Sequence, residues 1–305
     1  MNSVTASADD ENTDLRVGFS ARLFVDVNEN DARAALKVWS RAMGDERGIP
    51  VDPNVSIYKS IDEIRAALLT EQVDCVSMTT VELWQIHQTV PVWPTIVLGT
   101  SDEGVSSEFV LLVHNDSPVR QFSDLQGESL LIHGNGNDEF AKRWLETELL
   151  DAKLGRLEDF WSKTTTAPKL SRAILPVFFK QEKACLVTRA AFRTMAELNP
   201  QVGRQLRVIA TSPSVVTVTF SFRANPDSPH RERLIAQVGR ITETTMGRQT
   251  LALFQTEELV ARPFTELEPS FALLDRHQRL LHELTAATAA ATSPATPAQG
   301  LLAPK

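Results

Sequence analysis

Short apolar segments alternate with helical segments in the first part of the chain, and this alternation constrains the fold more than any other feature. The strand-like segments are rich in apolar and β-branched residues and cover residues 15–19, 55–58 and 73–78. Helices are predicted from Asp31, Ile61 and Val81. Ser60 and Glu63 have the spacing of a capping box at the start of the second helix. Strand–helix–strand units of this kind place their strands parallel, with the helices packed on the sheet.

A second unit of the same kind follows in the sequence. Strands are predicted at residues 129–132, 183–187 and 207–210, and helices at residues 137–150 and 190–198. A β-branched strand after Ser214 then leads into a long helix, which Ser228 and Pro229 open as its cap and first-turn proline.

The chain is expected to cross between the two units twice, near residues 100–108 and 212–218. We therefore predict an α/β fold of two lobes, each a mostly parallel sheet flanked by helices, with two crossover hinge segments. The predicted boundaries are residues 15–105 and 213–284 for lobe I, and residues 106–212 for lobe II. Two such lobes enclose a cleft that is a natural site for a small ligand.

Both ends of the chain are predicted to lie outside the lobes. Residues 1–14 are small, polar and acidic and form a disordered leader, and residues 285–305 form a disordered tail rich in Ala, Thr and Pro. Ala6, Ser7 and Ala8 resemble the end of a cleaved secretory signal whose apolar part is missing, while a cytoplasmic leader fits them equally well. The protein is therefore expected to be periplasmic or extracytoplasmic if a signal peptide was removed, and cytoplasmic otherwise.

The charge balance excludes some classes of partner. The chain has 31 Lys and Arg against 39 Asp and Glu, a formal net charge of -8, so we expect neither nucleic acid nor an anionic membrane as a partner. A small anionic ligand remains compatible, because a few backbone N–H groups and one or two cations are enough for a local positive site.

The sequence contains none of the common catalytic patterns. His-Glu-x-x-His, Cys-x-x-Cys, Gly-x-Ser-x-Gly and the phosphate-binding P-loop are all absent, and the six histidines have no spacing typical of metal ligands. The two cysteines, Cys75 and Cys185, are expected to be buried fillers in corresponding strands of the two units. We therefore predict no catalytic residue, no metal site and no cofactor.

The most informative local pattern is LIHGNGND, residues 131–138, in which a strand ends, glycines allow a sharp turn and a helix begins. The free N–H groups at such a helix start bind anions or carbonyl oxygens. The candidate ligand-binding residues here are Gly134, Asn135, Gly136 and Asn137. A structural interpretation stays open, in which Asn137 caps the helix and nothing binds there.

Loops at the ends of the other strands supply further candidates, because doubly wound sheets bind ligands at the carboxyl ends of their strands. The candidates are polar side chains at or just after a strand end: Ser20, Arg22, Tyr58, Ser60, Ser77, Thr79, Thr80, Thr188 and Arg189. Lys169 and Arg172 are candidates to supply positive charge. We expect about a third of these residues to contact a ligand and the rest to cap helices or face solvent.

Four segments of the chain carry a resemblance to a known family. They are LRVGFS at residues 15–20, SIYKSIDEIRAALLTEQVDCVSMTT at residues 56–80, SPVRQFSDLQGESLLIHGNGND at residues 117–138, and the stretch that begins QLRVIATSPSVVTVTFSF at residues 205–254. With them the chain resembles the phosphonate, phosphite and phosphate-type solute-binding proteins of ABC importers, a branch of the type II periplasmic binding protein fold.

The resemblance implies a binding protein and not an enzyme. Its expected ligand is a small anion, either a phosphonate, a phosphite or a phosphate-like oxyanion, which the two lobes capture by hinge closure. Its expected form is a monomer that delivers the ligand to a membrane permease or reports it to a sensor.

The resemblance also locates the family's binding positions in this chain. The anion-binding run at the helix start of the second lobe falls on residues 134–137, and the family's basic contact falls near Lys169 or Leu170. The acidic residues that hold an aminoalkyl group in the family fall near Ala191 and Thr217. Thr217 is therefore a further candidate contact, and an aminophosphonate is not expected as the ligand.

Two other functions are compatible with the same fold. One is a cytoplasmic enzyme similar to the menaquinone-pathway proteins that resemble these binding proteins. The other is a ligand-sensing domain, with the Ala/Thr/Pro tail as its tether.

Overall fold

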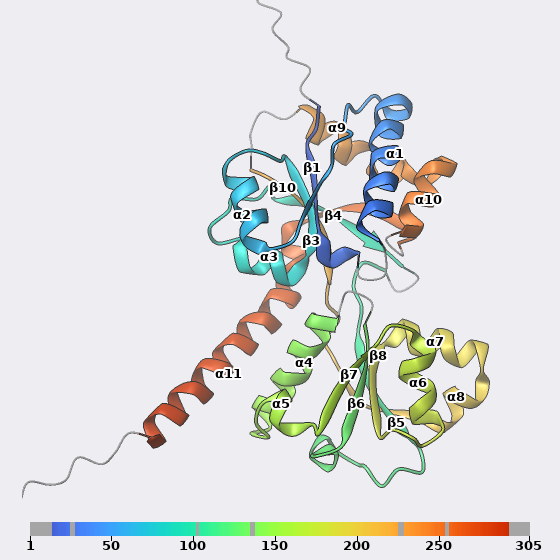
Figure 1. Cartoon of the computed structure of the whole chain (residues 1–305), viewed down its shortest axis with the longest axis vertical. Coiled ribbons are helices and arrows are strands. Elements are labelled where there is room, and N and C mark those ends of the chain that lie inside the picture. Colours follow the sequence, from blue (N-terminus) through green and yellow to red (C-terminus); the bar gives the residue numbers. More distant parts are fainter. Residues whose placement is uncertain are drawn as a thin grey trace, which may run out of the picture.

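The computed structural model describes residues 14–24, 28–101, 104–134, 138–224, 229–253 and 256–292. Its strands form two separate sheets, each in its own lobe (Figure 1). The two-lobed α/β fold expected from the sequence is confirmed. The leader at residues 1–13 and the end of the predicted tail at residues 293–305 lie outside the described residues.

The first sheet forms lobe I and has six strands in the order β11-β4-β10-β3-β1-β2. These strands are β1 (Val17–Ser20), β2 (Ser56–Tyr58), β3 (Cys75–Thr79), β4 (Thr95–Thr100), β10 (Val218–Phe222) and β11 (Glu258–Pro263). The helices around it are η1 (Ala21–Leu23), α1 (Glu29–Arg47), α2 (Ile61–Leu69), α3 (Thr80–Ile86), α9 (Pro229–Gln237), η3 (Val238–Glu243), α10 (Thr245–Leu253) and η4 (Phe264–Leu267).

The second sheet forms lobe II and has five strands in the order β7-β6-β8-β5-β9. These are β5 (Phe109–His114), β6 (Ser129–His133), β7 (Lys163–Ala167), β8 (Ala184–Thr188) and β9 (Leu206–Thr211). The helices of this lobe are η2 (Phe122–Leu125), α4 (Asp138–Asp151), α5 (Leu157–Phe160), α6 (Leu170–Phe178), α7 (Arg189–Leu198) and α8 (Pro200–Gln205).

Both sheets are mixed, whereas the sequence predicted mostly parallel ones. Strand β1 pairs in parallel with β2 and β3, and β6 pairs in parallel with β7 and β8. Strands β5 and β10 instead run antiparallel to both of their neighbours. The reason is the chain path: each of these two strands directly follows a crossover, so it enters its sheet from the edge at which the parallel strands end.

The two crossovers lie side by side between the lobes. Ser107 and Val215 exchange two backbone hydrogen bonds of 2.8 and 3.0 Å, and the hydroxyl oxygens of Ser106 and Ser214 are 2.7 Å apart. Next to them, the hydroxyl of Ser212 accepts a hydrogen bond of 2.7 Å from the N–H of Phe109. The lobes are thus joined by a short paired connection.

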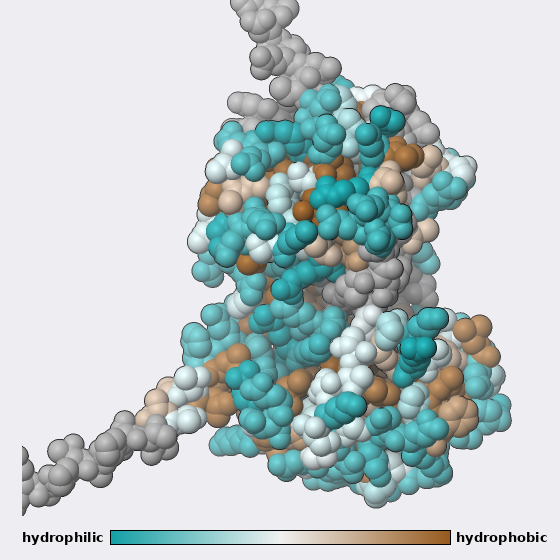
Figure 2. Space-filling view, in the orientation of Figure 1, coloured by the Kyte–Doolittle hydropathy of each residue, from teal (hydrophilic) through white to brown (hydrophobic). Residues whose placement is uncertain are grey.

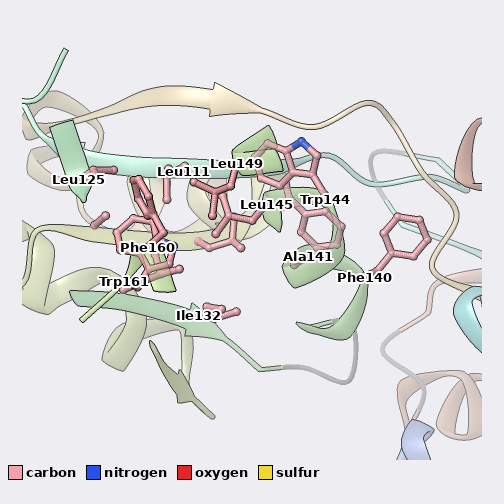
Figure 3. Close-up of a cluster of buried hydrophobic side chains, with 14 of the residues drawn as sticks. Leu111, Leu125, Ile132, Phe140, Ala141, Trp144, Leu145, Leu149, Phe160 and Trp161 are labelled. Atoms are coloured by element: carbon pink, nitrogen blue, oxygen red, sulfur yellow. The ribbon is translucent and has the colours of Figure 1, made fainter. Parts of the chain in front are cut away.

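Alternating strand residues divide the buried side chains between the two faces of each sheet. In lobe I, β4 directs Val97 to the face that α1, η3 and α10 cover, and Ile96 and Leu98 to the face that α2 and α3 cover. In lobe II, Phe109 of β5 packs against Phe140 and Trp144 of α4, within the cluster that Figure 3 shows.

The predicted long helix after Ser228 is interrupted in the structure. It consists of α9, the 3-10 helix η3 and α10. Gly239 and the β-branched residues Ile241, Thr242 and Thr244 lie at the interruption, and residues of these types have low α-helix propensity. This break places the apolar side chains of η3 over the sheet of lobe I.

The last helix, α11 (Glu268–Thr292), extends into the segment that the sequence predicted as a disordered tail from residue 285. The Ala residues at 286–291 explain the difference, because Ala has the highest helix propensity. The start of α11 is held in lobe I, where the hydroxyl of Ser270 accepts a 2.8 Å hydrogen bond from the N–H of Val216. Further along, α11 packs against α4 of lobe II (Figure 1).

Both cysteines are buried and free, in β3 and β8. Burial raises the pKa of Cys75 well above its usual range and also raises the pKa of Cys185. Both thiols are therefore fillers that do not ionise at neutral pH. Within the described residues, no helix is both long enough and apolar enough to cross a membrane.

Candidate ligand-binding site

A cavity of about 430 Å³ lies between the lobes and continues into lobe I. Figure 2 shows the two lobes meeting at a waist, with hydrophilic residues over much of its visible surface. The edge of the cavity is built from strand ends, because β6 ends at His133 and β8 at Thr188, and both side chains line it. Lobe I supplies the larger part of the wall.

Four of the residues predicted from the sequence line this cavity. They are Arg22, Ser77, Thr188 and Thr217. Thr188 also caps α7, since its hydroxyl accepts a hydrogen bond of 3.2 Å from the N–H of Ala191. Ser77 lies on β3 between Phe19 and Phe220 of the neighbouring strands, and Thr217 ends the return crossover. The structure thus brings these four together from four different parts of the chain.

Arg22 is the single Lys or Arg among the described residues that line the cavity. It lies in η1, whose cap is Ser20, and its guanidinium is about half exposed. Its Nε is 3.6 Å from the Oε1 of Glu82, and its Nη1 forms an ion pair with Glu139 at the start of α4. This ion pair crosses the cleft from lobe I to lobe II, so Glu139 is a competitor for any anion that approaches Arg22.

Ser20 and Thr79 do not line the cavity, because both hydroxyls bond to the buried carboxylate of Glu82. Ser20 donates to its Oε1 at 2.7 Å, and the N–H and hydroxyl of Thr79 donate to its Oε2 at 2.9 and 3.0 Å. Thr79 and Glu82 together form the capping box of α3. These candidates therefore position the strand ends around the cavity without facing it.

Three more predicted residues of lobe I lie outside the cavity lining. Ser60 caps α2 and accepts a hydrogen bond of 3.2 Å from Glu63. Tyr58 is half-buried against Gly18, and burial raises the pKa of its phenol. Thr80 is fully buried, and its N–H donates to the carbonyl of Thr217 at 2.9 Å.

In lobe II, Gly134, Lys169 and Arg172 also lie outside the lining. Gly134 is buried between β6 and β7, where its N–H donates to the carbonyl of Ala167 at 3.0 Å and a Cβ would lie 2.2 Å from the Cγ2 of Thr166. Lys169 and Arg172 are exposed at the start of α6. The candidates Asn135, Gly136 and Asn137 lie outside the described residues.

Several lining residues were not among the sequence candidates. The polar ones include His133, Ser101, Ser107 and Thr219, and the apolar ones include Phe19 and Trp39. His133 could have been found, since it is a strand-end residue within the LIHGNGND pattern. Trp39 had no such signal, because its place at the cavity depends on how α1 packs on the sheet. Within the described residues, no group of three or more His, Cys, Asp or Glu side chains is arranged to hold a metal ion.

Comparison with known proteins agrees with this architecture. The family model for the periplasmic substrate-binding protein of phosphonate ABC transporters matches residues 24–262. No curated protein matches the chain.

Among solved structures, a Xanthomonas citri protein bound to ATP is 14% identical, with a TM-score of 0.62 over 88% of this chain and 99% of that one. A binding protein of a Pseudomonas aeruginosa ABC phosphonate transporter is 14% identical, with a TM-score of 0.56 over 91% and 93% of the two chains. PhnD1 from Prochlorococcus marinus, in complex with methylphosphonate, is 13% identical, with a TM-score of 0.56 over 88% and 98%. At these identities the likeness is one of fold.

Proposed function

This chain belongs to the family of periplasmic substrate-binding proteins of phosphonate ABC transporters, and we propose that it captures a small phosphonate or phosphate-like anion between its lobes. The family consists of transport proteins and not enzymes, and its members act outside the cytoplasm. Delivery of the ligand to a membrane permease, by this chain as a monomer, is part of the proposal.

The observation that carries the proposal is the cavity lined by both lobes. Arg22 and Ser77 reach it from lobe I, and His133 and Thr188 reach it from lobe II. A guanidinium, an imidazole and several hydroxyls are donors that match the oxygens of a phosphonyl group. Two of the structural neighbours hold methylphosphonate and ATP, and both molecules present tetrahedral phosphorus oxygens.

The connection between the lobes supports capture by hinge closure. The paired crossovers at residues 106–109 and 212–215 are the short link on which the two lobes can rotate, and we propose the boundaries of the lobes there. A ligand that contacts both lobes stabilises the closed arrangement over the open one.

The test is ligand-induced thermal stabilisation of the purified chain by methylphosphonate, phosphite and phosphate. A ligand at about 100 times its dissociation constant raises the free energy of unfolding by about 2.7 kcal/mol. Arg22→Gln is expected to abolish this gain. Arg65→Gln, on the outer helix α2, is the matched control that keeps it. Absence of stabilisation by all three anions would contradict the proposal.

A further inference from the structure

We propose that the ligand of this site carries an apolar group, an alkyl chain or an aromatic ring, which enters lobe I beside the anionic head. The inference rests on the proposed function for the head and concerns the rest of the ligand. It predicts that alkyl- and arylphosphonates bind more tightly than methylphosphonate or inorganic phosphate.

One wall of the cavity is a row of side chains across the sheet of lobe I. Phe19 of β1, Ser77 of β3, Phe220 of β10 and Val97 of β4 are direct partners in the strand register, so they project from the same face. All four line the cavity. The small side chain of Ser77 lies between two phenylalanines, which leaves a hollow with apolar sides.

The opposite wall comes from the helices that cover this face. Trp39 of α1, Leu234 of α9, Val238 and Ile241 of η3 and Leu251 of α10 all line the cavity. These five residues belong to the buried apolar cluster of lobe I. The cavity therefore continues from the cleft between the sheet and its helical layer, and we call this part the apolar arm.

The groups best suited to an anionic head lie at the cleft, and hydroxyls of lobe I, among them those of Thr219 and Thr256, also line the cavity. His133, Thr188 and Ser107 lie at the edge of lobe II or in the crossover, and Arg22 lies at the mouth of the cleft. A ligand with an anionic head at the cleft and an apolar group in the apolar arm would contact both kinds of lining. A small oxyanion would satisfy the polar end and leave the apolar walls facing only water, which gives up the stabilisation available from burying apolar surface.

The size of the cavity also indicates a ligand larger than inorganic phosphate. A volume of about 430 Å³ lies in the range of pockets that hold drug-sized molecules, roughly 300–1,000 Å³. A single water occupies about 30 Å³ of liquid volume, and an inorganic phosphate is only a few times larger. Space of this extent, continuous with the anion site, accommodates a substituent on phosphorus.

The experiment is calorimetric titration of the full chain with methyl-, propyl-, hexyl- and phenylphosphonate at fixed pH and ionic strength. Burial of each methylene is expected to raise the affinity about threefold to fourfold until the apolar arm is filled. Phenylphosphonate is expected to exceed methylphosphonate by at least tenfold. An affinity that does not change with chain length would overturn the inference.

Two variants localise the effect. Val238→Phe, and independently Leu259→Trp on the edge strand β11, add bulk to the arm and are expected to remove the gain of hexylphosphonate while methylphosphonate still binds. Val38→Phe, on the exposed side of α1, is the matched control and keeps the gain. The thermal midpoint of each variant without ligand identifies any variant that fails to fold. The titrations of the wild-type chain with phosphonates of increasing length test the inference without the variants.

A parallel titration with alkanols of the same chain lengths separates failure of the inference from failure of the proposed function. If methylphosphonate binds but the affinity does not rise with chain length, the proposed function is supported and binding in the apolar arm is contradicted. If the affinity for alkanols rises with chain length and no phosphonate binds, binding of apolar groups in the apolar arm is supported and capture of phosphonates is contradicted. Lack of binding by both series contradicts both.

Discussion

Arg22 shows how the neighbours of one residue determine what the site can bind. Its guanidinium lies between two glutamates, the buried Glu82 of its own lobe and Glu139 of the other lobe. Glu82 is already bonded to Ser20 and Thr79, so Glu139 is the carboxylate that an incoming anion must displace.

We therefore predict that Glu139→Gln increases the affinity for methylphosphonate. The substitution removes a competing negative charge from Arg22, and the expected gain is about threefold to fivefold, since a partly exposed ion pair is worth up to about 1 kcal/mol. Calorimetric titration at low and high salt measures it. Glu158→Gln, at an exposed glutamate of α5 in the same lobe, should leave the affinity unchanged. Equal affinities for wild type and Glu139→Gln would show that the ion pair does not compete.

Glu82 itself is expected to be a stability residue. Glu82→Ala leaves the hydroxyl of Ser20 and the N–H and hydroxyl of Thr79 without their acceptor in a buried place, so we expect a loss of about 2–3 kcal/mol in the free energy of unfolding. Urea unfolding measures this loss. Glu63→Ala removes the acceptor of the exposed N–H of Lys59, just before the cap of α2, and should cost less, about 1 kcal/mol. Equal losses of unfolding free energy for the two substitutions would show that burial of the Glu82 hydrogen bonds does not increase their contribution to stability.

At the scale of elements, the contact between α4 and α11 contains a carboxylate with a depressed pKa. Burial by itself would raise the pKa of Glu146, but hydrogen bonds from His277, Arg156 and the N–H of Leu157 lower it to about 2. The two side-chain bonds measure 2.8 and 2.7 Å. Because the folded pKa is lower than the ordinary value of 4.5, the stabilisation is present above about pH 4.5 and is lost as the pH falls toward 2.

We predict that Glu146→Gln destabilises the chain at neutral pH by about 2–3 kcal/mol and has much less effect near pH 2, where the wild-type carboxylate is about half protonated in the folded chain and most of its stabilisation is lost. Denaturant unfolding of both proteins at several pH values between 7 and 2 measures the difference. Glu283→Gln, at an exposed position of α11, is the control and should follow the wild-type curve. A difference between wild type and Glu146→Gln that does not shrink in acid would rule out this assignment.

At the scale of the whole molecule, the connections between the lobes determine how the lobes can move relative to each other. The two crossovers are paired, and α11 runs from the return crossover to lobe II, where Arg276 forms an ion pair of 2.7 Å with Asp151. Trp84 of α3 donates to Asp275 at 2.8 Å, so α11 contacts elements of both lobes. Motion of the lobes must therefore be accommodated along α11 as well as in the crossovers.

Hinge closure predicts that a saturating phosphonate reduces the radius of gyration of the chain in solution. Small-angle X-ray scattering with and without methylphosphonate measures it. The reduction should be absent in Arg22→Gln at the same ligand concentration, because that variant lacks the cation that we propose binds the anionic head. An unchanged radius of gyration in a wild-type sample that calorimetry shows to be saturated would mean that the protein binds methylphosphonate without closure of the lobes.

Particular residues show where prediction from sequence succeeds for this chain and where it cannot. Thr188 could be identified because strand ends and caps follow from local patterns of residues, whereas Ser77 lines the cavity from the middle of β3 and not from its end. Ser20 and Thr79 match the same pattern but bond to Glu82, a competitor that a strand-end pattern does not reveal. The start of α11 at lobe I and its packing on lobe II had no local signal at all.

The amino-acid sequence by itself determined the alternation of strands and helices, the two lobes and the family, because each depends on short-range periodicity and on motifs within single segments. Only the tertiary structure decided which polar side chains face the cavity, that Arg22 is opposed by Glu139, and that Phe19, Trp39 and Val238 enclose an apolar arm. These features join residues from separate elements. They depend on packing distances and on competition between partners, neither of which is encoded within one segment.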